Sequence, residues 1–161
     1  YLLITTHYPP KNCRYSYPQT NMAKTVIKFT NEDDYDFILI GLACQHRDYR
    51  LCHELNRTLG ISMMKKDDYT VFNNKRMEDH AFSFYEFTNE EGDRYNLISN
   101  RCPKGVLLPE QKALDYLFLI RPDKTRIDES ELLQKLKNIR ILLGVYKLEV
   151  LKLKSKDNLL F

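Results

Sequence analysis

Four side chains of the kinds that bind zinc occur within ten residues of this sequence, at Cys44, His46, Cys52 and His53. A structural zinc site needs four such ligands to converge as a tetrahedron, at about 2.0–2.3 Å from the metal. The apolar pattern around position 52 predicts a helix, on which neighbouring side chains point about 100° apart. Cys52 and His53 therefore diverge, which disfavours both a shared metal and a nucleophilic Cys–His pair. We expect no metal site and no catalytic residue here.

A second set of candidates lies in the stretch LPEQKALDY, Leu108–Tyr116. Glu110 and Asp115 could carry out acid–base chemistry if the fold placed them in one cleft with different pKa values. The structural alternative is a polar junction, in which Pro109 and Glu110 suit the first turn of a helix and Asp115 leads into a strand. We favour the junction and keep a small enzyme as an alternative.

Polar residues near the expected helix complete the candidate binding set. An enzyme would require the fold to bring Asp48, Arg50 and His53 into one cleft with the carboxylates of 108–116. No sequence motif that cradles nucleotide phosphates is present, so no cofactor is expected. The candidate binding residues are Asp48, Tyr49, Arg50, His53, Asn56, Glu110, Asp115 and Tyr116.

The stretch 145–157, VYKLEVLKLKSKD, is rich in lysine. Lysines along a strand could line one sheet edge and contact the phosphates of RNA, while the aromatic residues of 81–87 stack on bases. The alternative is an edge strand whose lysines prevent aggregation, with the aromatic side chains packed in the core. We favour this alternative and retain an RNA-binding module as the second hypothesis. The candidate RNA contacts are Lys147, Lys152, Lys154 and Lys156.

The size and charge of the chain restrict its class. With 161 residues, of which 43% are hydrophobic and 29% charged, the composition is typical of a globular domain. The net charge of +3 is small for a general nucleic-acid binder. The longest apolar run, 37–44, is far shorter than the roughly 18–20 residues that span a bilayer, and no signal peptide is evident. We expect a cytoplasmic protein without membrane contact, whose cysteines are reduced thiols.

The elements that must position these residues are two helices and several strands. An apolar stripe predicts a helix within 46–61, with Gly60 at its C-terminal cap. Asp128, three residues before Glu131, has the spacing of an N-terminal cap for a second helix that ends near residue 139. Alternating or continuous apolar patterns predict strands at 25–29, 35–43, 69–72, 81–87, 94–99, 115–120 and 141–151.

This order of elements predicts an α+β fold, in which a mostly antiparallel sheet carries two helices on one face. The portion 115–151 has the form of the split βαβ element of ferredoxin-like folds. Residues 1–21 contain three prolines, no glycine and no regular periodicity, and a methionine follows at position 22. We expect 1–21 to be a disordered or non-native N-terminal extension and 22–161 to form a single α+β domain.

Several stretches together resemble an uncharacterised bacterial family that is named after its signature, the IPExxxVDY family. The signature corresponds here to LPEQKALDY, with Leu108 in place of Ile and Leu114 in place of Val. The resemblance extends from about residue 22 to the end of the sequence, and implies no activity and no catalytic residue. Further similar stretches are 36–56, 95–100 and 153–161.

These patterns favour a non-catalytic binding or regulatory module that acts through a cytoplasmic protein partner. The hydrophobic stretch Leu159–Phe161 is a candidate docking element. RNA binding through the C-terminal lysines and a small enzyme built around Glu110 and Asp115 are the alternatives. The sequence leaves the oligomeric state open.

Overall fold

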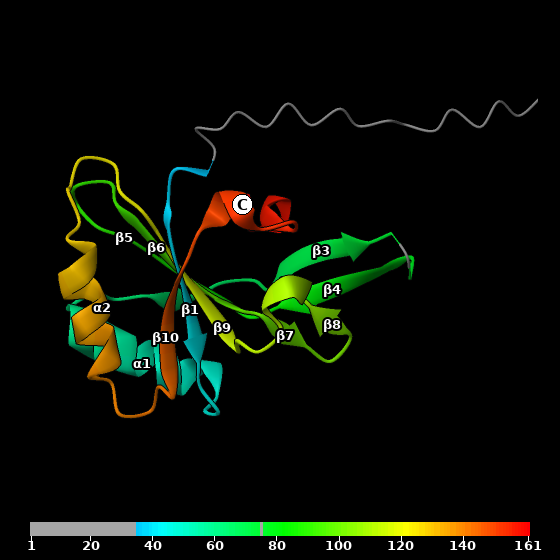
Figure 1. The fold of residues 1–161 in the computed structure, drawn as a ribbon, viewed down its shortest axis with the longest axis horizontal. Coiled ribbons are helices and arrows are strands. Elements are labelled where there is room, and N and C mark those ends of the chain that lie inside the picture. Colours follow the sequence, from blue (N-terminus) through cyan, green and yellow to red (C-terminus); the bar gives the residue numbers. More distant parts are fainter. Residues whose placement is uncertain (1–34, 75) are drawn as a thin grey trace, which may run out of the picture.

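The computed structural model describes residues 35–74 and 76–161, and Figure 1 shows how they are arranged. This part of the chain forms a six-stranded sheet, two two-stranded sheets and two α-helices. In chain order the elements are β1 (Ile38–Ala43), α1 (Asp48–Leu59), β2 (Met64–Lys65), β3 (Tyr69–Asn73), β4 (Glu78–Phe82), β5 (Phe84–Thr88), β6 (Arg94–Ser99), β7 (Arg101–Cys102), β8 (Gly105–Val106), β9 (Tyr116–Arg121), α2 (Glu129–Lys137) and β10 (Gly144–Leu148).

The main sheet has the strand order β10-β1-β9-β6-β5-β2, and all its neighbouring strands are antiparallel. β1 lies between β9 and β10 and is antiparallel to both. β9 and β10 therefore run parallel to each other, and α2 connects them as the helix of a split βαβ element. The predicted α+β fold with a mostly antiparallel sheet is confirmed.

Both helices cover the same face of the main sheet, as Figure 1 shows. Leu51 and Leu55 of α1 and Leu136 of α2 are completely buried, in one core cluster with Ile40 and Phe118 of the sheet. Burial of one such leucine side chain stabilises a fold by about 2 kcal/mol. The apolar stripes of the two helices are therefore the main reason why they lie on this face.

The predicted helix ends are also confirmed. Gly60 follows α1 with φ of 68°, a left-handed conformation that glycine adopts without a steric penalty. At the start of α2 the Asp128 carboxylate accepts hydrogen bonds from the backbone N–H groups of Ser130 (2.9 Å) and Glu131 (3.2 Å). These bonds satisfy donors that have no partner within the helix.

The opposite face of the sheet is covered in part by the segment that follows β10, which Figure 1 shows near the label C. This segment forms 3₁₀ turns at Val150–Lys152 and Lys156–Leu159. Val150, Leu153 and Leu159 are buried in the second core cluster on this face. The stretch that we considered as a docking element therefore packs, through Leu159, on the sheet of its own chain.

Three strand predictions need correction. The strand predicted at 35–43 begins only at Ile38, as β1. Residues 81–87 form the end of β4 and most of β5, with Ser83 between the two strands. Hydrogen bonds to other elements hold Ser83 at this break. Its carbonyl accepts one from Ser99 N–H (2.9 Å), and its hydroxyl donates one to Asp48. The stretch 141–151 is a strand only over Gly144–Leu148, because burial of Val150 turns the chain into the first 3₁₀ turn.

Other expectations fall on different parts of the chain. The expected strand at 25–29 and the N-terminal extension at 1–21 lie outside the described residues. The strands observed at Tyr69–Asn73, Arg94–Ser99 and Tyr116–Arg121 agree closely with the predicted ones. Neither helix within 35–74 and 76–161 has the length and apolar character needed to cross a membrane.

Asp128→Ala should lower the free energy of unfolding by about 1 kcal/mol, because two N–H groups at the start of α2 lose their side-chain acceptor. Urea denaturation followed by circular dichroism measures the change. Asp67→Ala is the matched control, since Asp67 is exposed and its side chain has no bonded partner in the described part. Equal stability of the two variants would contradict the assigned cap.

Candidate functional site

Asn100 is the centre of the polar junction formed by the 108–116 stretch. Its side chain is completely buried. The Nδ2 group donates to the carbonyl oxygens of Gln111 and Leu114, both at 2.9 Å, and Oδ1 accepts from Leu108 N–H at 2.9 Å. Its backbone N–H donates to the carbonyl oxygen of Asp115 at 2.8 Å. The amide therefore determines the path of the whole stretch from Leu108 into β9.

The carboxylate of Asp115 is engaged on both of its oxygens. Oδ2 accepts a hydrogen bond from Cys44 N–H at 2.9 Å, and Oδ1 lies 3.2 Å from Nε of Arg101. The Asp115 backbone N–H donates to the carbonyl oxygen of Leu42 at 3.0 Å. Asp115 thus connects the end of β1, the start of β9 and β7. This is a structural role.

Glu110 connects the same stretch to the segment that follows β10. Its carboxylate accepts a hydrogen bond from Ser155 N–H at 2.8 Å. Asn158 adds a parallel link, since its Nδ2 donates to the carbonyl oxygen of Leu107 at 2.9 Å. Glu110 and Asp115 therefore have different partners, on the covering segment and on β1 respectively.

Asp48 and Tyr116 of the predicted set both lie where the start of α1 meets the end of the sheet. Tyr116 is buried in β9, and its hydroxyl donates to the carbonyl oxygen of His46 at 2.8 Å, just before α1. Asp48 lies in the first turn of α1, where it accepts a hydrogen bond from the Ser83 hydroxyl and one from Tyr49 N–H at 2.8 Å. These contacts attach the start of α1 to the end of the sheet.

The protonation of this cluster follows from its burial. Burial raises the pKa of Tyr116 well above its usual range, and the charge of Asp48 raises it further. Burial and Asp48 likewise raise the pKa of Tyr85 to about 12. Burial also raises the pKa of Asp48, but hydrogen bonds from Ser83 and Tyr49 outweigh that effect and lower it. At neutral pH the carboxylate is ionised and both phenols are protonated, so none is poised for acid–base catalysis.

The remaining members of the predicted set lie elsewhere on α1. Tyr49, Arg50 and His53 are exposed to solvent. Asn56 binds the backbone of Met63 with both ends of its amide, at 3.0 Å from Nδ2 to the carbonyl oxygen and 2.9 Å from N–H to Oδ1. The predicted binding set is therefore divided between an internal junction and an exposed helix surface.

The C-terminal lysines do not line one strand edge, because only Lys147 belongs to β10. Lys147 forms an ion pair with Glu129, and Lys152 forms one with Glu149 at 2.7 Å. Lys156 lies over the ring of Tyr35, with Nζ 4.4 Å from the ring centre, and Lys154 is exposed. The period-two basic edge of the RNA hypothesis is thus not formed. Of the aromatic residues at 81–87, Phe82 and Tyr85 are buried.

The cysteine chemistry is that of core thiols. Burial raises the pKa of Cys44, and burial together with the charge of Asp48 raises that of Cys52 to about 11. A nucleophilic cysteine requires the opposite shift. Across residues 35–74 and 76–161 the cysteines form no disulfide, and three or more potential metal ligands do not gather at any point.

β10 forms one edge of the main sheet, as one interpretation of the lysine-rich stretch predicts. It pairs with β1 on one side, and no strand of the described chain pairs with its other side. Three large apolar side chains in or near it are exposed: Leu143 (68%), Tyr146 (54%) and Leu151 (63%). Sequence reasoning missed these residues, because a period-two pattern does not show which side chains a neighbouring segment covers.

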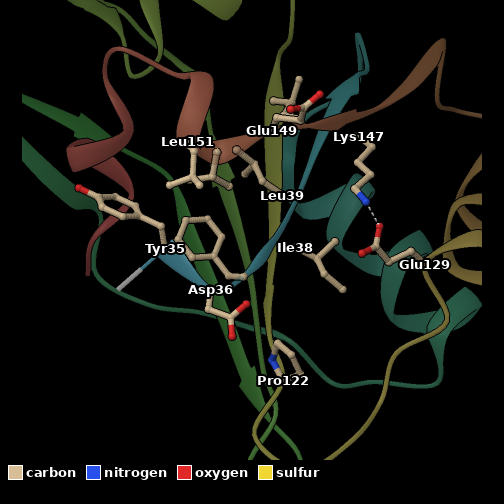
Figure 2. Close-up of a pocket in the computed structure, with 12 residues that line it drawn as sticks. Tyr35, Asp36, Ile38, Leu39, Pro122, Glu129, Lys147, Glu149 and Leu151 are labelled. Carbon is tan, nitrogen blue, oxygen red and sulfur yellow. Dashed lines mark ion pairs between the residues drawn. The ribbon is translucent and has the colours of Figure 1, made fainter. Parts of the chain in front are cut away.

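A cavity of about 330 Å³ opens where β10 ends, and Figure 2 shows its lining. The lining comes from residues 35–39, from the end of β10 with the following turn, from Pro122 after β9 and from Glu129 at the start of α2. In Figure 2, Lys147 points at Glu129, with which it forms an ion pair. Asp36 and Glu149 add two further carboxylates, so the lining has a net negative charge.

Comparison with known proteins identifies no relative of this chain. Neither a scan against protein-family models nor a search of curated proteins finds a match for this chain.

Asn100→Ala should lower the free energy of unfolding by about 3 kcal/mol, because it leaves Leu108 N–H and two carbonyl groups without a buried partner. Asn74→Ala, at an exposed position, is the control and should change stability by less than about 0.5 kcal/mol. Urea denaturation compares the variants. A similar small effect at both positions would show that Asn100 does not organise the junction.

Glu110→Gln should reduce the loss of stability in acid. Burial raises the pKa of Glu110, but several hydrogen bonds, the strongest of them from Ser155 N–H, together outweigh that effect and hold the folded-state pKa below the ordinary value of about 4.3. The stability that this carboxylate contributes is fully present above pH of about 4.3 and is lost as the pH falls through the lower, folded-state pKa. Denaturation at a series of pH values from roughly 3 to 7 should give a flatter profile for the variant.

Glu90→Gln is the control for this pH profile, because Glu90 is exposed and its side chain makes no bond to any described residue. Its profile should follow that of the native chain. If Glu110→Gln also follows the native profile, the hydrogen bond from Ser155 does not stabilise the folded state.

Proposed function

We propose that the protein is a small non-catalytic binding module that captures an extended segment of a protein partner along the outer edge of β10. The observation that carries the proposal is a five-residue edge strand with exposed apolar side chains beside it. The outer side of such a strand presents N–H and C=O groups to which a partner segment can add as a further strand.

The charges beside this edge favour pairing. A lysine on an edge strand normally discourages the approach of another strand. Lys147 is compensated, however, because its ammonium group forms an ion pair with Glu129 at the start of α2. Leu143 and Tyr146 meanwhile expose more than half of their surface. The edge therefore offers apolar contacts with little net repulsion.

The other edge of the main sheet provides a comparison within the same molecule. β2 is only two residues long, and its Lys65 forms an ion pair with Asp68. A strand this short offers few backbone groups to an incoming segment. β10 is therefore the better surface for strand addition.

The cavity at the end of β10 gives the partner segment a place for one side chain. In strand addition, backbone hydrogen bonds supply affinity and side-chain pockets supply selectivity. The carboxylates of Asp36, Glu129 and Glu149 outnumber the single ammonium group of Lys147 in the lining. We infer a partner segment that places a lysine or arginine side chain in this cavity.

We further propose that the chain is a member of the bacterial IPExxxVDY family and acts in the cytoplasm. Support for membership is that three stretches with the resemblance bind one another, through the side chains of Asn100 and Glu110. Support for a reducing compartment is that Cys44 and Cys52 are buried as thiols.

An affinity pull-down of the full chain from lysate of its own cells, at low and high salt, tests the proposed interface. Tyr146→Lys adds an uncompensated charge at the β10 edge, and Met64→Lys is the control, because Met64 is similarly exposed (65%) on the opposite edge. We expect the native chain and Met64→Lys to retain a protein at high salt. Tyr146→Lys should bind that protein about tenfold more weakly.

A partner that all three proteins retain equally would exclude the β10 edge as the interface. RNA that is recovered at low salt and lost at high salt, without a protein, would favour the RNA-binding hypothesis instead. Circular dichroism of both variants verifies that the substitutions leave the fold intact.

A further inference from the structure

Arg121, the last residue of β9, holds its guanidinium group between two aromatic rings. The central carbon of the group lies 4.8 Å from the ring centre of Phe37 and 4.7 Å from that of Phe161. Nη2 donates a hydrogen bond to the Leu159 carbonyl oxygen at 2.8 Å, and Nη1 donates to Oδ1 of Asn96 at 3.3 Å. These contacts hold the guanidinium group in one position.

In the described chain, the groups in contact with the Arg121 guanidinium are aromatic rings and neutral oxygens. Burial lowers its pKa, and the like charge of Arg94, its cross-strand partner in β6, lowers it further. Within residues 35–74 and 76–161 no carboxylate forms an ion pair with it. An arginine that is partly removed from water is normally held by a carboxylate or phosphate. This guanidinium retains N–H groups and a charge that the described residues do not satisfy.

Asn96 provides a second unpaired donor at the same place. Its side chain is 1% exposed, and its oxygen already accepts from Arg121. Nδ2 is buried without an acceptor in the described chain, and Glu86, opposite Asn96 in β5, does not supply one. Rotating the amide would set its N–H groups against the guanidinium, so the cation dictates this orientation. Buried polar groups nearly always have partners, so Nδ2 requires an explanation.

The walls beside these donors are aromatic. The ring of Phe161 contacts those of Tyr69 and Phe84 edge-on, with centres 5.1 and 5.0 Å apart. Phe37 is buried, whereas Phe161 is 37% exposed, so Phe161 is the aromatic wall that faces solvent. A molecule that enters there meets N–H donors at one end and aromatic rings along its body.

From this arrangement we infer that Asn96 and Arg121 form a binding site for the carboxylate of a small organic acid with an aromatic or apolar body. The carboxylate oxygens accept hydrogen bonds from Asn96 Nδ2 and from an N–H of Arg121, and the body packs against Phe161. Two donors match the two oxygens of a carboxylate, whereas a phosphate dianion needs more donors to replace its hydration. This site lies on β6 and β9 and is independent of the proposed interface at β10.

Thermal unfolding of the full chain in sodium benzoate, acetate, phosphate or chloride at constant ionic strength tests this site. We expect benzoate to raise Tm with saturation, by about 4 °C at ten times its dissociation constant, and phosphate to match chloride. The side-chain amide signals of Asn96 in ¹⁵N-labelled protein should shift as benzoate is added, because Nδ2 gains an acceptor.

Two variants of Asn96 assign the effect to this position. Asn96→Asp places a carboxylate beside Arg121 within the chain, and Asn96→Leu removes the donor, so each should weaken benzoate binding about tenfold or more. Asn74→Asp makes the same change of charge at an exposed position and should respond like the native chain. A benzoate effect that persists in both Asn96 variants, an equal effect of phosphate, or no effect of either carboxylate on the native chain would overturn the site.

Discussion

A single buried amide, that of Asn100, holds together parts of the chain that are distant in sequence. Its side chain binds the stretch from Leu108 to Leu114. Within this stretch Glu110 binds the covering segment, and Asp115, which follows it, binds the backbone at the end of β1. A satisfied polar network in a low-dielectric interior is rigid, because movement leaves a buried group without a partner. The loop, the centre of the sheet and the segment over its second face therefore depend on one another.

The position of β1 between two strands explains why the described sheet ends at β10. β1 occupies the position between β9 and β10, so the strand that follows α2 is placed outside it. β1 itself is covered on both faces, and Gly41 is required on the second face, where a Cβ would come within 2.1 Å of Leu114 Cδ1. Both edges of β1 are occupied by β9 and β10, so β10 presents the free edge at this end of the described sheet.

Local patterns were enough to predict the parts of this fold that depend on local physics. The apolar stripe of α1, the left-handed Gly60 and the Asp128 cap all act within a few residues. The break at Ser83 was not predictable, because it depends on hydrogen bonds to Ser99 and Asp48, which belong to other elements. The 3₁₀ turn that begins at Val150 was missed for a related reason, since an alternating pattern does not reveal burial on the second face.

For the candidate site, sequence reasoning supplied a list of residues but not their arrangement. The sequence did not indicate which members of the set would be neighbours, and the partners of Glu110 and Asp115 lie 45 and 71 residues away. No spacing rule connects residues across such distances. No sequence pattern indicated Asn96 or Arg121, because a donor can be recognised as unpaired only when the positions of its neighbours are known.

The position of β1 has a consequence for how the chain acquires its fold. β1 precedes every other described strand, yet its two neighbours, β9 and β10, are the last two described strands in chain order. Contacts that close such long loops form slowly, because the chain loses entropy on closing the loop before the strand pairing stabilises it. On the ribosome the apolar sequence ILIGLA therefore emerges long before its neighbours exist. Until β9 and β10 have been synthesised, this segment has no native partner strand, and unpaired apolar strands are prone to misassembly.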